Sequence, residues 1–284
     1  MSAGTRESTL SGVGGVTLHR VEWECALPQA VVVLIHGYAE HIGRYQHVAD
    51  RLAAEHYRVV GYDHRGHGLS TGVTKGTIDS FEALVDDLAT VIDSVGTDLP
   101  IFLYGHSMGG LVAARYLERS SEGIAGAVLA SALLKSADSI PAVLVKVANV
   151  LGKIAPKLPT IALDGAAISR DGVVRASYDS DPLNYRGKLT AGTGAQMNLT
   201  TAAAFADAAK ITAPLLVLHG SADALTDVEG SRRFASVVGS SDVTFSEYQG
   251  CFHELHNEPE KEAVLDEIVA WLNSHRSASA SATE

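Results

Sequence analysis

Residues 101–120 read IFLYGHSMGGLVAARYLERS, and more than any other stretch they indicate the architecture of the chain. The run from Ile101 to His106 is mostly apolar, which is typical of a strand covered on both faces. The pattern Gly-x-Ser-x-Gly follows, with its serine at position 107. The next residues have the composition of a helix, so the stretch predicts a strand, a tight turn and a helix.

The serine in this turn has the setting of a nucleophile. Its glycine neighbours, two residues before and two after, leave room where side chains would collide in a strained backbone. The turn also directs the N-terminus of the following helix at Ser107, so the Met108 N–H and the helix dipole can stabilise an oxyanion. Ser107 is therefore the candidate nucleophile.

Apolar, β-branched runs alternate with helical segments along most of the chain. The other predicted strands are Val16 to Trp23, Ala30 to His36, Tyr57 to Asp63, Ala125 to Ser131, Pro214 to His219 and Val243 to Tyr248. The predicted helices cover residues 44–56, 80–95, the run after Met108, and 262–275. This alternation predicts the α/β class, with a mostly parallel sheet flanked by helices.

The alternation stops after Ser131 and resumes only at Ala213. A gap of that length exceeds an ordinary connection and predicts an inserted cap. Leu144, Val147, Ala148 and Leu151 recur there at helical spacing before Pro156 and Pro159, so the cap is expected to be largely helical. The predicted domains are a discontinuous core at 12–131 and 210–276, a cap at 132–209, and flexible termini at 1–11 and 277–284.

Composition excludes several classes of protein. The 284 residues include 22 Lys and Arg against 33 Asp and Glu, a net charge of −11 that disfavours nucleic acid as a partner. Cys25 and Cys251 lie too far apart for a zinc motif or a disulfide framework, which favours a reducing compartment. No signal peptide or membrane-spanning run is visible, so a cytoplasmic location is expected.

A serine nucleophile needs a histidine base that a carboxylate orients, in the chain order Ser, Asp, His. Asp223 lies four residues past the predicted strand end at His219, and His253 lies in the loop after the last predicted strand. Asp227 and His256 are alternatives. We favour Asp223 because Asp227 starts the next helix as a cap, and His253 because His256 lies where the last helix is entered.

The second oxyanion donor is expected after the strand that ends at His36. There Gly37 allows a sharp turn, and the backbone N–H of Tyr38 can lie beside that of Met108. The loop DHRGHGLS at residues 63–70 follows another strand and is interpreted as architectural support. Although the chain has 12 histidines, no H-E-x-x-H run occurs, so we expect no metal. A serine triad cleaves esters without a cofactor, so we expect no cofactor.

Several stretches, in this order, resemble a known family: HGYAEHIGRY, DHRGHGLS, GHSMGG, SDPL, GSAD and FHELHNEPE. They are similar to the α/β-hydrolase superfamily and, within it, to the monoacylglycerol (monoglyceride) lipases. The resemblance covers about Val16 to Leu272. Its narrowest signals are H-G-x-x-E-H-x-x-R-Y and the placing of Tyr178 before Ser180-Asp181-Pro182-Leu183.

This resemblance implies the α/β-hydrolase fold and the cleavage of monoacylglycerols to fatty acid and glycerol through an acyl-enzyme. The site residues that it implies are the triad Ser107, Asp223 and His253, the backbone donors Tyr38 and Met108, and, at the glycerol end of the substrate, Glu40, Arg44 and Tyr178. The alternatives are a lysophospholipase or a broad carboxylesterase, and, from another class, a non-catalytic ligand-binding protein on the same fold.

One departure from the family concerns the oxyanion turn. Family members commonly have H-G-x-G where this chain has His36-Gly37-Tyr38-Ala39. Tyr38 is also bulkier than the small residue often found at its position. The shape of the substrate pocket is expected to differ accordingly.

The cap has a charge opposite to that of the whole chain. From Lys135 to Leu163 it carries four lysines, at positions 135, 146, 153 and 157, against the single Asp138. The stretch IPAVLVKVANVLGKIAP is more apolar than one core-facing helix requires. These features predict a peripheral membrane contact through the cap, and a cap helix packed on the core is the alternative.

Overall fold

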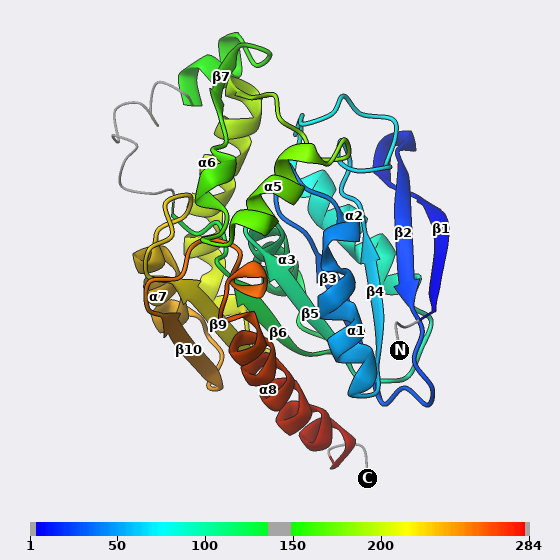
Figure 1. Cartoon of the computed structure of the whole chain (residues 1–284). Helices are drawn as coiled ribbons and strands as arrows, with labels where there is room; N and C mark the ends of the chain where they lie inside the picture. The colour runs from blue at the N-terminus through cyan, green and yellow to red at the C-terminus, as the bar shows by residue number, and fades with distance from the viewer. Residues whose placement is uncertain (1–3, 136–148, 282–284) are drawn as a thin grey trace.

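The computed structural model describes residues 4–135 and 149–281. Within these residues one eight-stranded sheet runs in the order β1-β2-β4-β3-β5-β6-β9-β10 (Figure 1). Its strands are β1 (Thr5–Ser11), β2 (Thr17–Trp23), β3 (Ala30–Ile35), β4 (Tyr57–Tyr62), β5 (Ile101–His106), β6 (Ile124–Ala130), β9 (Leu215–Gly220) and β10 (Val243–Tyr248).

All seven strands predicted from apolar runs are present, each within one residue of its expected ends. The pairs β1–β2 and β2–β4 are antiparallel, and the other neighbours in the sheet are parallel. The predicted α/β class with a mostly parallel sheet is therefore confirmed.

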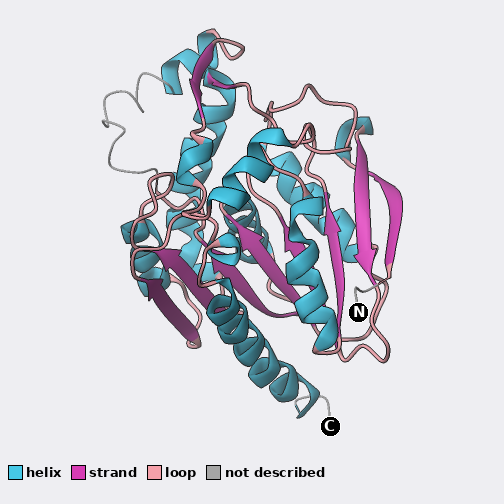
Figure 2. Ribbon diagram, in the orientation of Figure 1, coloured by secondary structure: helices cyan, strands magenta, loops and turns pink. Residues whose placement is uncertain are grey.

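Helices cover both faces of the sheet (Figure 2). They are α1 (Gln46–Ala54), α2 (Phe81–Asp93), α3 (Met108–Arg119), α5 (Gly172–Ser180), α6 (Ala191–Asp207), α7 (Val228–Val237) and α8 (Lys261–Ser281). Buried side chains of α2, α3 and α7 pack on one face, and those of α1 and α8 pack on the other.

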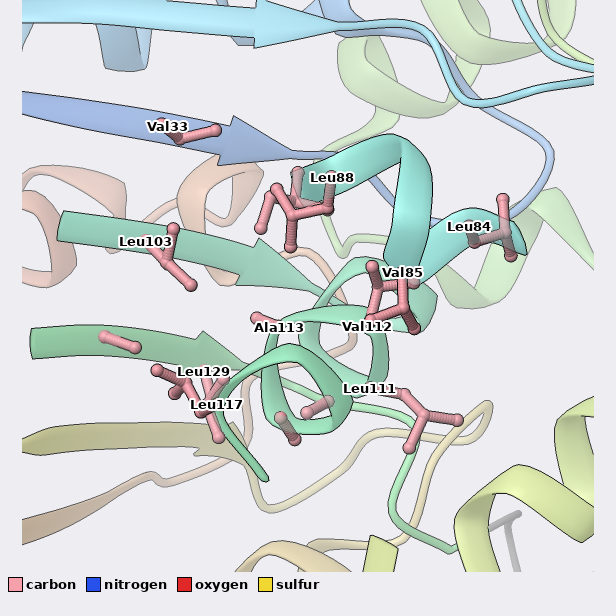
Figure 3. Packing of buried hydrophobic residues seen from close by; sticks show 14 of the residues in the cluster. Val33, Leu84, Val85, Leu88, Leu103, Leu111, Val112, Ala113, Leu117 and Leu129 are labelled. Carbon is pink, nitrogen blue, oxygen red and sulfur yellow. The ribbon is translucent and has the colours of Figure 1, made fainter. Parts of the chain in front are cut away.

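The residues of strand β3 must be apolar throughout because both faces of the strand are covered. Val31 and Val33 point into the cluster with α2 and α3, whereas Val32 and Leu34 point into the cluster with α1 and α8. Figure 3 shows the first of these layers, with Leu88 and Leu117 packed over the strands. Burying such a side chain contributes roughly 1.5–3 kcal/mol, so a polar residue on either face would be costly.

The N-terminal segment differs from the expectation of flexible residues 1–11. Thr5–Ser11 forms β1, which pairs along its whole length with β2, and Arg6 pairs with Glu22. Six of its seven side chains are exposed and Leu10 is half-buried. This edge strand is therefore held by backbone hydrogen bonds more than by burial, which is why its sequence, TRESTLS, gave no apolar signal.

The segment between β6 and β9 lies over the edge of the sheet at which the parallel strands end, with α5, α6 and β7 above it in Figure 1. It is not purely helical, because β7 (Pro159–Ala162) and β8 (Lys188–Thr190) form a short antiparallel pair. Of the cap helix predicted around Leu144 to Leu151, residues 136–148 lie outside the described part, and residues 149–154 are helical. The division into a core and a cap at 132–209 stays a prediction.

The C-terminal end also differs from its expected boundary. Helix α8 continues to Ser281, beyond the predicted helix end at His275 and into the tail expected to be flexible. The residues of this tail are mostly serine and alanine, and alanine favours a helix once one is nucleated. No helix in the described residues is long and apolar enough to cross a membrane.

Candidate active site

The strand β5 runs directly into α3 through Ser107. This serine has φ 53° and ψ −118°, a backbone conformation that side-chain-bearing residues seldom adopt. The strained residue is held by its neighbours, because its N–H donates to Ala130 O (3.0 Å) and its carbonyl accepts from Leu133 N (2.9 Å). The turn predicted from Gly-x-Ser-x-Gly therefore places Ser107 at the N-terminus of α3.

Close backbone contacts explain the glycines around this serine. A Cβ atom on Gly105 would lie 2.5 Å from Gly109 O, and one on Gly109 would lie 2.1 Å from Ile35 O. Both distances are too short for any side chain to fit without backbone movement. The glycines thus allow β3, β5 and α3 to approach closely under the nucleophile.

Asp223 and His253 come together although 30 residues separate them. His253 Nδ1 lies 2.7 Å from Asp223 Oδ2, and the loops after β9 and β10 carry the two residues. The other oxygen, Asp223 Oδ1, accepts from the N–H groups of Leu225 (2.8 Å) and Thr226 (3.0 Å). These bonds fix the carboxylate, which in turn orients the imidazole.

A second histidine contacts the same carboxylate. His219 Nε2 lies 3.3 Å from Asp223 Oδ2, and His219 Nδ1 lies 2.8 Å from the Ser231 hydroxyl. Sequence reasoning used His219 only to mark the end of a strand. The sequence signal that could have identified His219 is its position four residues before Asp223, at the end of the strand that Asp223 follows.

The charges of this cluster favour an ionised aspartate. Burial raises the pKa of Asp223, but His253 and His219 outweigh that effect and lower it below its usual value. Burial lowers the pKa of His253. The charge and hydrogen bond of Asp223, together with the charges of Glu254 and Glu40, outweigh this effect and raise the pKa overall. The pair is thus suited to hold a proton that His253 receives during a reaction.

The two alternatives lie elsewhere. Asp227 caps α7 by accepting from Glu229 N (2.8 Å), and it pairs with Lys135. His256 lies under the site, with its ring stacked on Tyr45 at 4.8 Å, and burial lowers its pKa well below the usual value. Both have structural partners, as expected for residues outside the reacting group.

The turn after β3 lies beside Ser107. Gly37 N donates to Glu40 Oε1 (2.5 Å), and a Cβ on Gly37 would lie 3.2 Å from Ser107 Cβ. Tyr38 and Met108, whose backbones are the candidate oxyanion donors, both line the pocket that also contains Ser107 and His253. The Tyr38 hydroxyl donates to Gly76 O (2.7 Å), and this hydrogen bond holds the side chain away from the Tyr38 backbone N–H.

The pocket has an apolar part and a polar part. The apolar side chains come mainly from the segment between β6 and β9: Leu133, Ile161, Leu163, Ile168, Leu189, Met197 and, after β9, Leu225. Its polar side chains other than Ser107 and His253 are Tyr38, Glu40, His106, Tyr178, Thr226 and Glu254. Such a pocket suits a ligand with a long apolar chain and a small polar end.

Glu40, Arg44 and Tyr178 lie together at the polar part, with a further residue that the sequence did not indicate. Arg44 donates to Glu40 Oε2 (2.7 Å) and to both oxygens of Glu254 (2.6 and 2.7 Å), and it lies over the Tyr178 ring. Glu40 and Glu254 are almost fully buried. This buried ion-pair network joins the turn of Tyr38 to the loop of His253, so Arg44 fixes its neighbours' positions.

We predict that Glu254→Gln moves the acid limb of the kcat/KM profile to lower pH. If His253 is the base, its neutral form is the active one, and the Glu254 charge stabilises its protonated form. Removing that charge lowers the pKa of His253, so the neutral form persists at lower pH. The matched control is Glu22→Gln, which removes a buried charge on β2 that pairs with Arg20 and Arg58. An acid limb that stays in place or moves to higher pH would contradict this electrostatic role.

Across the described ranges, 4–135 and 149–281, one group of side chains has spacing suited to a metal ion: Cys251, Glu258 and Glu260. Arg170 already pairs with both glutamates and lies 3.4 Å from Cys251 Sγ. The guanidinium thus supplies the positive charge that a metal would bring.

The sequence is also similar to those of known proteins. A family model described as "Serine aminopeptidase, S33" matches residues 26–260. The chain is 42% identical to a monoacylglycerol lipase of Mycolicibacterium smegmatis over 280 residues, which are 97% of this chain and 100% of that protein. It is 36% identical to the Homo sapiens monoglyceride lipase, over 89% of this chain and 85% of that protein.

The fold matches as well. The crystal structure of Paleococcus ferrophilus monoacylglycerol lipase superposes with a TM-score of 0.83 at 34% identity, covering 91% of this chain and 99% of that one. The similarity thus extends over both the sheet and the segment above it.

Proposed function

The chain belongs to the serine aminopeptidase S33 family, and from its similarity to lipases we infer that it is a carboxylic ester hydrolase that cleaves monoacylglycerols to fatty acid and glycerol. The observation that carries the inference is its similarity, over nearly the full chain, to a monoacylglycerol lipase. The pocket supports it, because an acyl chain and a glycerol group need the two kinds of lining described above.

In the proposed mechanism, Ser107 Oγ attacks the ester carbonyl carbon while His253 Nε2 accepts the hydroxyl proton. The tetrahedral intermediate collapses as His253 returns this proton to the departing glycerol oxygen, which leaves an ester on Ser107. Water then attacks that ester, with His253 again taking the proton, and the fatty acid is released. Asp223 holds His253 in the tautomer that leaves Nε2 free.

Charge on the tetrahedral oxygen is stabilised by the backbone N–H groups of Tyr38 and Met108 in this proposal. Met108 begins α3, so the positive end of the helix dipole adds to its hydrogen bond. No cofactor takes part in these steps.

Each part of the pocket binds a different part of the substrate. The acyl chain lies against the apolar side chains of the cap, where burial contributes roughly 0.8 kcal/mol for each methylene. The glycerol group lies near Glu40 and the ring of Tyr178, whose hydroxyl donates to Ala39 O, and Arg44 holds both side chains in place. A phosphate-bearing headgroup would meet the buried carboxylates of Glu40 and Glu254, which disfavours lysophospholipids.

The test is a kinetic panel of monoacylglycerols, lysophospholipids and short alkyl esters with matched acyl chains. We expect the highest kcat/KM for the monoacylglycerols. A higher value for lysophospholipids, or equal values for all three classes, would replace the proposed substrate by one of the alternatives.

We also propose that the cap meets a membrane surface. Val150, Ile154 and Leu158 expose 58%, 74% and 44% of their area, and Lys153 and Lys157 lie exposed among them. Apolar side chains flanked by lysines suit an interface with anionic lipids. Of the other two lysines, Lys135 pairs with Asp227, and Lys146 lies outside the described residues.

Changing Lys153 and Lys157 to Glu should slow the hydrolysis of monoacylglycerol in anionic vesicles more than that of a short soluble ester. The difference should shrink as salt rises, because salt screens the attraction. Lys210→Glu with Lys261→Glu makes the same change of charge on the core. If the cap and core variants behave alike on vesicles, the membrane contact is wrong.

The proposed location is the cytoplasm, with peripheral contact to a membrane. Cys25 and Cys251 are free thiols, which suits a reducing compartment.

A further inference from the structure

Ala39, in the turn that carries Tyr38, has an unusual backbone. Its φ is 65°, in the left-handed region that glycine adopts freely and alanine does not. Its side chain is almost fully buried. A residue with a Cβ stays in this conformation only where neighbouring groups hold it.

Two donors from the cap hold the Ala39 carbonyl. The Tyr178 hydroxyl donates to Ala39 O at 3.2 Å, and the Tyr185 N–H donates to the same oxygen at 3.1 Å. Tyr178 is itself fixed, because its carbonyl accepts from Asn184 Nδ2 (3.0 Å) and Arg44 lies over its ring. We call this pair of hydrogen bonds the Ala39 clamp.

The same cap segment contacts the residues on either side of Ala39. His41 Nε2 lies 2.8 Å from Asp181 Oδ2, and the rings of Tyr38 and Tyr185 meet edge to face at 6.2 Å. Residues 178–185 therefore contact three residues of the turn, Tyr38, Ala39 and His41, whereas Glu40 secures it from the core side through Gly37 N.

We propose that residues 178–185 of the cap are positioning residues for the oxyanion hole, acting through the Ala39 clamp. If residue 39 leaves the left-handed region, the peptide planes beside it rotate, and the adjoining Tyr38 backbone moves with them. The cap then contributes to the stabilisation of the transition state as well as to the binding of the acyl chain. This inference rests on the proposed function for the role of the Tyr38 N–H.

A different role for the Tyr178 hydroxyl gives different kinetics. If it bound the glycerol of the substrate, its removal would affect only esters that carry glycerol. If it acts through Ala39, every ester loses the same stabilisation, because each one forms the oxyanion.

The test combines Tyr178→Phe with Ala39→Gly and uses a monoacylglycerol and the methyl ester of the same fatty acid. Tyr178→Phe should lower kcat about tenfold on both esters, with KM changed less than about twofold. In the Ala39→Gly background the same change should cost no more than about threefold, because glycine adopts φ near 65° without the steric strain that the clamp offsets in alanine. Tyr57→Phe, which removes a tyrosine hydroxyl bonded to Asn273 far from the site, controls for general loss of stability.

The proposal would be overturned if Tyr178→Phe slowed only the monoacylglycerol, or if it cost as much in the Ala39→Gly variant as in the parent. An unchanged kcat in Tyr178→Phe would also overturn it. Active enzyme is counted by titration with a fluorophosphonate, so a fraction of unfolded protein does not imitate a lower kcat. The methyl ester tests the clamp even if monoacylglycerols prove poor substrates, which separates this proposal from the proposed function.

Discussion

Ser107→Ala is expected to lower kcat for monoacylglycerol hydrolysis by at least about 10⁴-fold while the protein stays folded. The variant removes the only oxygen that forms the acyl-enzyme in the proposed mechanism. Alanine and serine have the same backbone preference, so the strained conformation at φ 53° costs both alike. Circular dichroism and the melting temperature should therefore match those of the parent.

A second serine offers a matched control for this variant. Ser131 also has positive φ (46°), is fully buried, and has a hydroxyl without a hydrogen-bond partner in the described residues. Ser131→Ala should retain activity within about threefold, since surrounding backbone bonds are unaffected. Substantial turnover by Ser107→Ala would mean that another group is the nucleophile.

The second large effect is expected for Asp223→Asn, which should lose at least about 10³-fold in kcat. An asparagine amide in place of Oδ2 favours the wrong imidazole tautomer, with the proton on Nε2, so His253 cannot accept the serine proton. The ionised carboxylate also stabilises the imidazolium in the transition state, and this effect is lost as well.

Asp227→Asn tests whether Asp223 or Asp227 is the aspartate that orients His253. Its side chain caps α7 and pairs with Lys135, and asparagine is an equally good cap. This variant should keep kcat within about threefold of the parent. An inactive Asp227→Asn together with an active Asp223→Asn would transfer the acid role to Asp227.

Much of the fold could be predicted because burial imposes composition. Strands such as β3 are covered on both faces, so each residue must be apolar and the sequence records this directly. The edge strand β1 and the short pair β7–β8 could not be predicted in this way, because most of their side chains are exposed. Their stability depends on backbone pairing with a partner strand, and single residues carry little trace of it.

The candidate site also contains some residues that the local sequence indicates and others that only folding brings together. Ser107, Asp223 and His253 could be proposed because each follows a strand end in a fixed order, which the chain records locally. Glu254 could not, because its partner Arg44 lies 210 positions away and only folding brings them together. Ala39 was noted as a departure from the family, but its positive φ and its clamp depend on cap residues that are remote in the sequence.

The most direct test of the central claim is labelling with a fluorophosphonate, followed by mapping of the modified peptide. The compound phosphonylates an activated serine, so one equivalent should attach to Ser107, with loss of monoacylglycerol hydrolysis in proportion to labelling. The Ser131→Ala variant should label as the parent does, and Ser107→Ala should not label. Loss of hydrolytic activity with Ser107 unmodified, or complete labelling of Ser107 without loss of activity, would contradict the account.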